Sequence, residues 1–134
     1  MKYAYWLANI PGIHAAKIEI LYENAACAEE IYEFKWSSLK KMEGLTEEDA
    51  KNIYMSKKRW DVDEKWFSLM EQGIGFVSKE DSHFPEKLKY IPNAPYALYY
   101  VGNLPEESRK SVAIVGARGR SAYGSEVAKR LGKV

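Results

Sequence analysis

The sequence has little cysteine or histidine and no long apolar run. Of its 134 residues, one is a cysteine, Cys27, and two are histidines, His14 and His83. A single cysteine excludes an internal disulfide and is typical of a reducing compartment, and three such scattered residues do not make a metal site. Cys27 lies in a helical pattern and is expected to fill the core. No stretch approaches the length of a membrane span, and the apolar start is too short and aromatic for a signal peptide. We expect a cytoplasmic protein without metal, cofactor or membrane contact.

Charge is nearly balanced over the chain but is unevenly distributed along it. The net charge is +1. Residues 1–73 carry 10 Lys/Arg against 13 Asp/Glu, whereas residues 74–134 carry 10 against 6. Residues 109–134 hold seven basic side chains and one acidic side chain, Glu126. A positive field on this segment favours an anionic partner, and a solvated basic helix face is the alternative.

The basic segment contains a pattern that is suited to phosphate binding. Val112–Val115 form a continuous apolar run that fits a strand buried in a parallel sheet, and Gly116 ends it. Helix-forming residues follow from Ser125. A strand, a glycine-rich turn and a helix bring free backbone amides to the positive end of a helix dipole. Arg118 stands where dinucleotide sites have their second glycine, which favours a polynucleotide backbone or a mononucleotide over NAD.

Six residues of this turn are the candidate nucleic-acid-binding residues: Gly116, Arg118, Arg120, Ser121, Tyr123 and Gly124. Ser121 either donates a hydrogen bond to a phosphate or caps the following helix. Tyr123 either stacks on a base or packs beside the sheet, with packing favoured. Arg120 is expected to act through its charge.

The first third of the chain has helical periodicity with two candidate hairpin turns. The first helix is expected to end at Pro11-Gly12, and the second runs over about His14–Tyr22. An apolar-Pro-Gly-apolar turn between short helices is typical of a helix-hairpin-helix motif, in which Gly12 lets a DNA backbone approach closely. Packing within a helical bundle is the alternative use of such a turn.

A second hairpin turn is predicted around Gly44, after helices over about Ala25–Phe34 and Ser37–Met42. Thr46 is the expected N-cap of the next helix. Four acidic side chains lie where a phosphate would have to come: Glu43, Glu47, Glu48 and Asp49. These charges suit the helix dipole rather than a polyanion, so for residues 1–58 a structural or protein-binding role is favoured over DNA binding.

The connector to the second half begins as a helix and then changes to strands. Asp61 is the expected N-cap, and Gly73 is the expected stop. Four apolar residues should form its buried stripe: Val62, Trp66, Leu69 and Met70. Trp60 either packs or stacks on a base, with packing favoured. Strands are predicted over about 74–77 and 97–101, with a proline-rich short helix and an extended connection between them.

The pattern Val-Ala-Ile-Val-Gly-x-Arg-x-x-Ser-x-Tyr-Gly at 112–124 resembles the signature that opens the Rossmann-like domain of the DNA-processing protein A family (DprA, also called Smf). Upstream residues agree with the family's approach to that strand: Asp81, Phe84-Pro85, Leu88, Ile91, Pro95, Leu98-Tyr99 and Gly102-Asn103-Leu104. Phe84 stands where tyrosine is usual. The resemblance covers roughly residues 74–132 in fixed order and spacing.

The resemblance implies a multi-domain α/β fold. A helical, sterile-alpha-motif-like domain is expected at residues 1–72, and the N-terminal part of a three-layer Rossmann-like domain at 73–134. Because the family continues through further βα units, the Rossmann-like domain is expected to be incomplete. Exposed apolar surface is then expected near Val112–Val115, together with self-association or a displaced terminal segment.

The resemblance also implies a function in DNA recombination. Such a protein binds single-stranded DNA, with Arg118 at a phosphate contact, and delivers the DNA to a RecA-type recombinase during natural transformation, without enzymatic turnover. The alternatives are a Rossmann-like nucleotide-binding enzyme fragment and a protein-interaction module that acts through the helical domain. The sequence offers no paired-carboxylate pocket, nucleophile elbow or Cys/His pair, so no catalytic residue is predicted.

Overall fold

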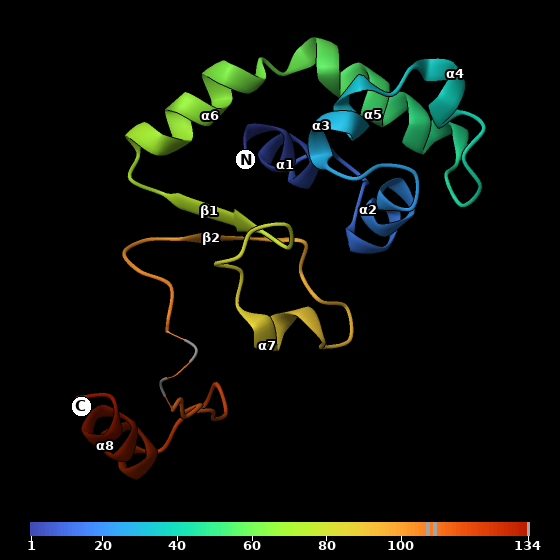
Figure 1. Ribbon diagram of the computed structural model, residues 1–134. Coiled ribbons are helices and arrows are strands. Elements are labelled where there is room, and N and C mark those ends of the chain that lie inside the picture. Colours follow the sequence, from blue (N-terminus) through green and yellow to red (C-terminus); the bar gives the residue numbers. More distant parts are fainter. Residues whose placement is uncertain (107, 109, 134) are drawn as a thin grey trace.

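The computed structural model describes residues 1–106, 108 and 110–133. In these residues the elements follow the order α1 (Lys2–Ala8), α2 (Ala15–Tyr22), α3 (Ala28–Glu33), α4 (Trp36–Leu39), α5 (Glu47–Arg59), α6 (Val62–Glu71), β1 (Gly75–Ser78), α7 (Glu86–Lys89), β2 (Ala97–Tyr100) and α8 (Ala122–Leu131). The fold is mixed α/β, as predicted. Figure 1 shows α5 and α6 running one after the other along one side of the molecule, above α1 and the two strands.

Helix α1 lies at the centre of the helical body. It contacts α3, α6 and β1, and its Trp6 and Leu7 are fully buried. The Trp6 indole N–H donates to Ser56 Oγ on α5 over 2.9 Å, so the polar end of this large side chain is satisfied inside the core. The helix that the sequence predicts before Pro11-Gly12 is therefore α1.

The ends of α5 and α6 are fixed by the side chains that the sequence singled out. Thr46 Oγ1 accepts from the Asp49 backbone N–H over 3.1 Å, and the Asp49 carboxylate accepts from the Thr46 N–H over 3.0 Å. Asp61 caps α6 by accepting from the Glu64 N–H over 3.0 Å. Gly73 follows α6 with a φ of +68°, a conformation that favours glycine. Both predicted N-caps and the predicted stop are confirmed.

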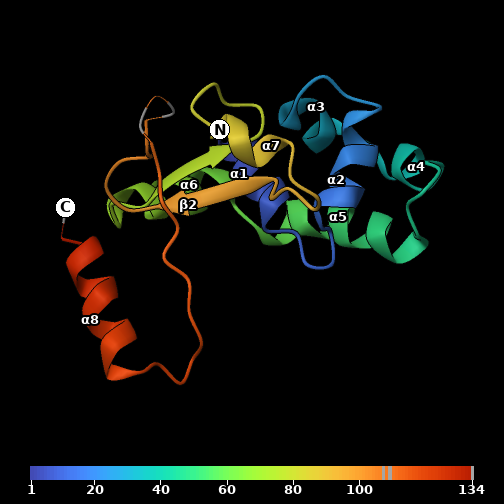
Figure 2. The ribbon, with the colours of Figure 1, turned by 90° about the horizontal axis from the view of Figure 1, so that it is seen from below.

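The two strands form an antiparallel pair, in register from Gly75 opposite Tyr100 to Ser78 opposite Ala97. Both strands were predicted, and the short helix expected between them is α7. A side chain at position 75 would collide with the Tyr100 ring, so glycine allows that ring to lie across the strand. Phe76 and Tyr96 belong to the same buried core as the helices, and Figure 2 shows the hairpin lying against the helical body.

A cluster of aromatic rings joins the helices to the hairpin. The Tyr5 ring on α1 lies 5.5 Å from Trp60, 5.8 Å from Trp66, 5.4 Å from Phe76 and 6.1 Å from Tyr99, measured between ring centroids. Three of these four contacts are edge-to-face, the geometry that the ring quadrupoles favour. Trp60 therefore packs, as the sequence analysis favoured, although part of its surface remains accessible.

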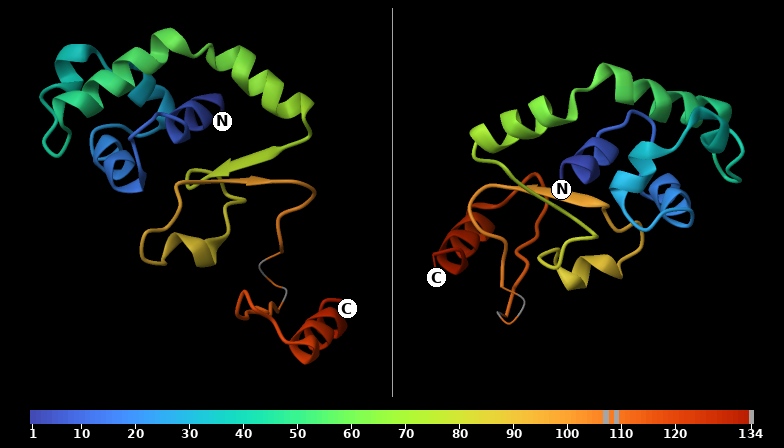
Figure 3. Two further views of the ribbon diagram at one scale, coloured as in Figure 1. Left: turned by 180° about the vertical axis from the view of Figure 1, so that it is seen from behind. Right: turned by 45° about the horizontal axis from the view of Figure 1, so that its top comes forward.

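The predicted strand at Val112–Val115 is wrong for this structure. The segment makes no strand pairing, and Val112 and Val115 are 88% and 90% exposed. A buried parallel strand needs a hydrogen-bonded neighbour and cover on both faces, and the described residues place neither beside this segment. The expected exposed apolar surface is confirmed. Helix α8 stands apart from the helical body in all views (Figure 1, Figure 2 and Figure 3), so the terminal segment is displaced.

Three smaller expectations also need correction. Met70 is 42% exposed, because α6 buries only the side that carries Val62 and Leu69 against the body. Cys27 is half-buried as the N-cap of α3 rather than a core residue. The helices α3 and α4 are shorter than predicted.

Replacing Tyr5 with alanine should destabilise the helices and the hairpin together. The loss of four ring contacts should lower the free energy of unfolding by roughly 3 kcal/mol. Urea unfolding followed by tryptophan fluorescence and by circular dichroism measures this change. Tyr90→Ala is the control, because its ring is 79% exposed and its loss should change stability little. Equal effects of the two substitutions would contradict the role of the cluster.

Candidate nucleic-acid interface

The candidate turn leads directly into α8 and is open to solvent. All six predicted residues are exposed: Gly116, Arg118, Arg120, Ser121, Tyr123 and Gly124. Neither Gly116 nor Gly119 has a positive φ or a close neighbour, so no preformed cradle exists around them. The structure therefore places the six residues on one continuous exposed segment, without closing them into a pocket.

Ser121 is the N-cap of α8. Its Oγ accepts from the Gly124 backbone N–H over 3.1 Å. A Cβ at position 124 would lie 3.3 Å from that Oγ, so glycine leaves room for the cap. Of the two roles that the sequence left open, the structure shows the capping one. The Ser121 hydroxyl hydrogen remains free to donate to an external acceptor, because the cap uses only a lone pair of the oxygen.

The basic side chains of this segment point to solvent without ionic partners. Among the described residues, Arg118 and Arg120 take part in no ion pair. Lys129 and Arg130 lie in the last turn of α8, where they complement the helix dipole. Arg109, which the sequence adds to this basic segment, lies outside the described residues.

Tyr123 does not pack beside a sheet. Its ring is 80% exposed on the first turn of α8. An exposed ring next to two unpaired arginines is available for stacking on a planar ligand. Packing, the role that the sequence analysis favoured, is not found within the described residues.

The two hairpin turns adopt the backbone that the sequence predicts. Gly12 and Gly44 have φ values of +79° and +88°. A Cβ at Gly44 would lie 2.7 Å from Ile20 Cδ1, so this turn packs closely against α2. Glycine is required at both positions for conformation, whatever binds there.

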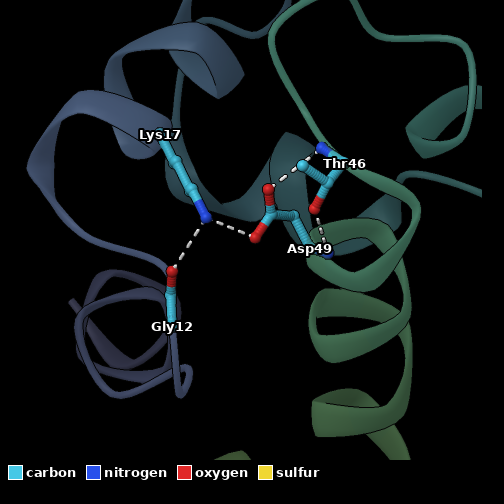
Figure 4. A network of polar contacts seen from close by, with 4 residues as sticks. All are labelled: Gly12, Lys17, Thr46 and Asp49. Carbon is cyan, nitrogen blue, oxygen red and sulfur yellow. Dashed lines mark hydrogen bonds and ion pairs between the residues drawn. The ribbon is translucent and has the colours of Figure 1, made fainter.

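A half-buried ion pair connects the first hairpin to the start of α5. Lys17 Nζ donates to the Gly12 carbonyl over 3.3 Å and to Asp49 Oδ1 over 2.5 Å (Figure 4). The Asp49 residue is 3% exposed. The same carboxylate belongs to the Thr46 capping box, so one acidic group serves two elements. The charge of Lys17 is thus neutralised within the protein, which agrees with the structural interpretation of this acidic region.

The Asp49 carboxylate has a lowered pKa. Burial alone raises it, but hydrogen bonds from Lys17 and from the Thr46 backbone and hydroxyl outweigh burial and hold it below its usual value. A carboxylate with a lowered folded-state pKa stabilises the protein above the unfolded-state pKa, and this stabilisation is lost as the pH falls through the folded-state pKa.

A second polar cluster lies between α2 and the strands. The Tyr22 and Tyr96 hydroxyls are 2.8 Å apart, and the Tyr96 hydroxyl donates to Glu80 Oε1 over 3.3 Å. Burial and the nearby Glu80 charge raise the pKa of Tyr96, and burial raises that of Glu80. Tyr96 therefore stays protonated and acts as a hydrogen-bond donor in the packing of the hairpin.

Sequence reasoning missed the cations at the junction of α5 and α6. Arg59 and Lys65 line a groove beside Pro11, although 48 to 54 residues separate them from it along the chain. The sequence signal was the basic end of α5, which the helix dipole already explains.

In the described part of the chain, no three potential metal ligands lie together. In the part of the chain that the structure describes, no helix is long and apolar enough to cross a membrane.

The fold and the exposed basic segment define a mixed α/β protein whose C-terminal part is open to an anionic partner. Comparison with known proteins shows which family that part resembles. Residues 75–134 match the family model for DNA recombination-mediator protein A. Over this segment the chain is similar to that family, and the resemblance to the DNA-processing protein A, or Smf, family is confirmed.

Two curated relatives share the name Protein Smf. The protein from Borreliella burgdorferi is 54% identical over 35 residues, which cover 26% of this chain and 11% of that protein. The protein from Synechocystis sp. is 23% identical over 96% of this chain and 34% of that protein. The chain therefore spans about a third or less of the length of these relatives. No solved structure matches it.

Replacing Asp49 with asparagine should make stability less dependent on pH. At pH 7 the variant should be less stable by roughly 1–3 kcal/mol, because Lys17 loses its ionic partner. The difference should shrink as the pH falls below about 4, the usual aspartate pKa, toward the lower pKa of the folded-state carboxylate. Urea unfolding at several pH values measures this, with the exposed Glu48→Gln on the same helical turn as control. A difference that stays constant with pH would contradict the assignment.

Proposed function

We propose that this protein binds single-stranded DNA through residues 110–133 and helps load a RecA-type recombinase in natural transformation. The observation that carries the proposal is the family match over residues 75–134, which includes the exposed basic turn. The family description supports a role in DNA recombination. Single-stranded DNA and the recombinase are the specific partners that we add.

The turn offers the groups that a single strand requires. The guanidinium groups of Arg118 and Arg120 are exposed, and each can hold a phosphate by two parallel hydrogen bonds. Ser121 can donate a further hydrogen bond, and the exposed Tyr123 ring offers a stacking surface to a base. None of these contacts reads a base edge, so binding should be largely independent of nucleotide sequence.

The fold of the family explains the exposed apolar segment. We infer that residues 73–134 are the N-terminal part of a Rossmann-like domain, and that residues 1–72 are a sterile-alpha-motif-like domain. Val112 and Val115 would be buried when neighbouring strands cover them. In this chain the same surface favours self-association, because large exposed apolar patches bring copies together.

Fluorescence anisotropy of labelled oligo-dT at two salt concentrations tests the DNA-binding step. Arg118→Ala should weaken binding roughly 10-fold, the effect of losing a hydrogen-bonded charge pair, and should lower the log-log salt slope by about 0.7. Lys41→Ala is the matched control: Lys41 is exposed, has no ion pair among the described residues and lies outside the turn.

Equal binding by the Arg118→Ala and Lys41→Ala variants would contradict the proposed site. The loading step has its own measurement, the rate at which a RecA-type recombinase assembles on oligo-dT with and without this protein. Unchanged assembly, together with intact DNA binding, would contradict the mediator role alone.

A further inference from the structure

A groove opens between the first hairpin turn and the junction of α5 and α6. It encloses about 420 Å³. Six of the residues that line it carry its chemistry: Pro11, Asn52, Met55, Arg59, Trp60 and Lys65. The volume falls within the range of small-ligand pockets and suits a single nucleotide, whereas a duplex could not enter without unpairing.

The lining combines an apolar floor with uncompensated positive charge. Pro11, Met55 and Trp60 supply the apolar surface. Arg59 and Lys65 are exposed and have no ion pair among the described residues. Among the described residues no carboxylate lines the groove. Two acidic residues, Asp61 and Glu64, are adjacent in sequence to lining residues, and an oxygen of Asp61 accepts a hydrogen bond from the Glu64 N–H. The groove is therefore complementary to a ligand with a flat apolar part and a negative charge.

Neighbouring pockets lack this combination. The pocket on the other side of Trp60 contains Asp61 and Asp63, and the latter pairs with Lys2 over 2.7 Å. The pocket beside the second hairpin contains Glu23 and Glu43. Charge thus distinguishes the two hairpins: acidic groups lie around the Gly44 turn, and unpaired cations lie beside the Pro11-Gly12 turn.

The Trp60 side chain has a further unusual property. Its Nε1–H is buried and has no acceptor among the described residues. An unmet buried donor costs free energy, and such groups are rare in folded proteins. Trp60 also sits between two elements, with its ring edge-to-face on Tyr5, so a ligand in the groove would contact a residue of the central aromatic cluster.

We propose that this groove is a nucleotide subsite for single-stranded DNA, separate from the turn at Arg118. A base would lie on the surface formed by Pro11, Met55 and Trp60, and its phosphate would lie between Arg59 and Lys65. Asn52 would offer its side-chain amide to the base. The proposal rests on the proposed function, because it adds a second contact for the same strand, and it gives the helical part of the chain a direct part in DNA binding.

Charge-matched double variants test the subsite by anisotropy with labelled oligo-dT. Arg59→Ala with Lys65→Ala should weaken binding roughly 10-fold and lower the log-log salt slope by about 1.4, which is two single-strand phosphate contacts. Lys35→Ala with Lys41→Ala removes the same charge from exposed positions around α4 and should change affinity less than about 2-fold. Circular dichroism and urea midpoints confirm that both double variants are folded.

Two further readouts separate a nucleotide subsite from general attraction. Oligo-dT should quench tryptophan fluorescence, and Trp60→Phe should remove most of that quenching. A blunt duplex of the same length should not distinguish the groove variant from its control. Equal weakening on duplex and single strand would overturn the subsite and leave a charge effect only.

The outcomes also distinguish this proposal from the function on which it rests. If Arg118→Ala weakens binding and the groove variant behaves like its control, the subsite is wrong and the proposed function stands. If the groove variant weakens binding and Arg118→Ala does not, the subsite is supported and the turn is not the site. Absence of oligo-dT binding by the wild-type protein would overturn both.

Discussion

The packing of four aromatic rings around Tyr5 is the constraint on which the rest of the structure depends. These rings come from the α5–α6 junction, α6, β1 and β2, so one side chain of α1 fixes the strands on the helices. The Asn9 side-chain amide adds a hydrogen bond by donating to the Tyr99 hydroxyl over 2.5 Å. Because β2 is held in this way, the basic segment that follows it departs from a fixed point on the body. The same cluster contains Trp60, so it also supports one wall of the groove beside Pro11.

Some cations of this protein are paired within the fold, whereas others are exposed and have no ionic partner among the described residues. Lys17 is used internally, since Asp49 and the Gly12 carbonyl satisfy it and join the first hairpin to α5. Arg59, Lys65, Arg118 and Arg120 are exposed and have no ionic partner within the described chain. Surface cations that no internal group neutralises are the ones available to a polyanion. The acidic first turn of α5 should repel such a partner, which directs it toward the turn before α8 and the groove.

Local sequence signals predicted most of the fold. Amphipathic spacing located α1, α2, α5 and α6, and the caps at Thr46, Asp61 and Ser121 are short-range hydrogen bonds that a few residues specify. Local signals could not decide whether Val112–Val115 forms a strand. A strand needs a hydrogen-bonded neighbouring strand, and the periodicity of one segment does not show whether such a neighbour is present. The prediction that Met70 is buried was wrong for a related reason: helical spacing does not say how wide a stripe of the helix the body covers. The groove was beyond sequence reasoning, since Pro11, Arg59 and Lys65 meet only in the folded chain.

The central claim is that DNA contacts two sites with unpaired cations, the turn before α8 and the groove beside Pro11. Photocrosslinking of oligo-dT to the protein, followed by identification of the labelled peptides, tests it most directly. The account predicts labels in peptides that contain Tyr123 and Trp60, because aromatic rings at both sites would contact bases. Labels confined to the acidic region around Gly44 and the start of α5 would contradict it.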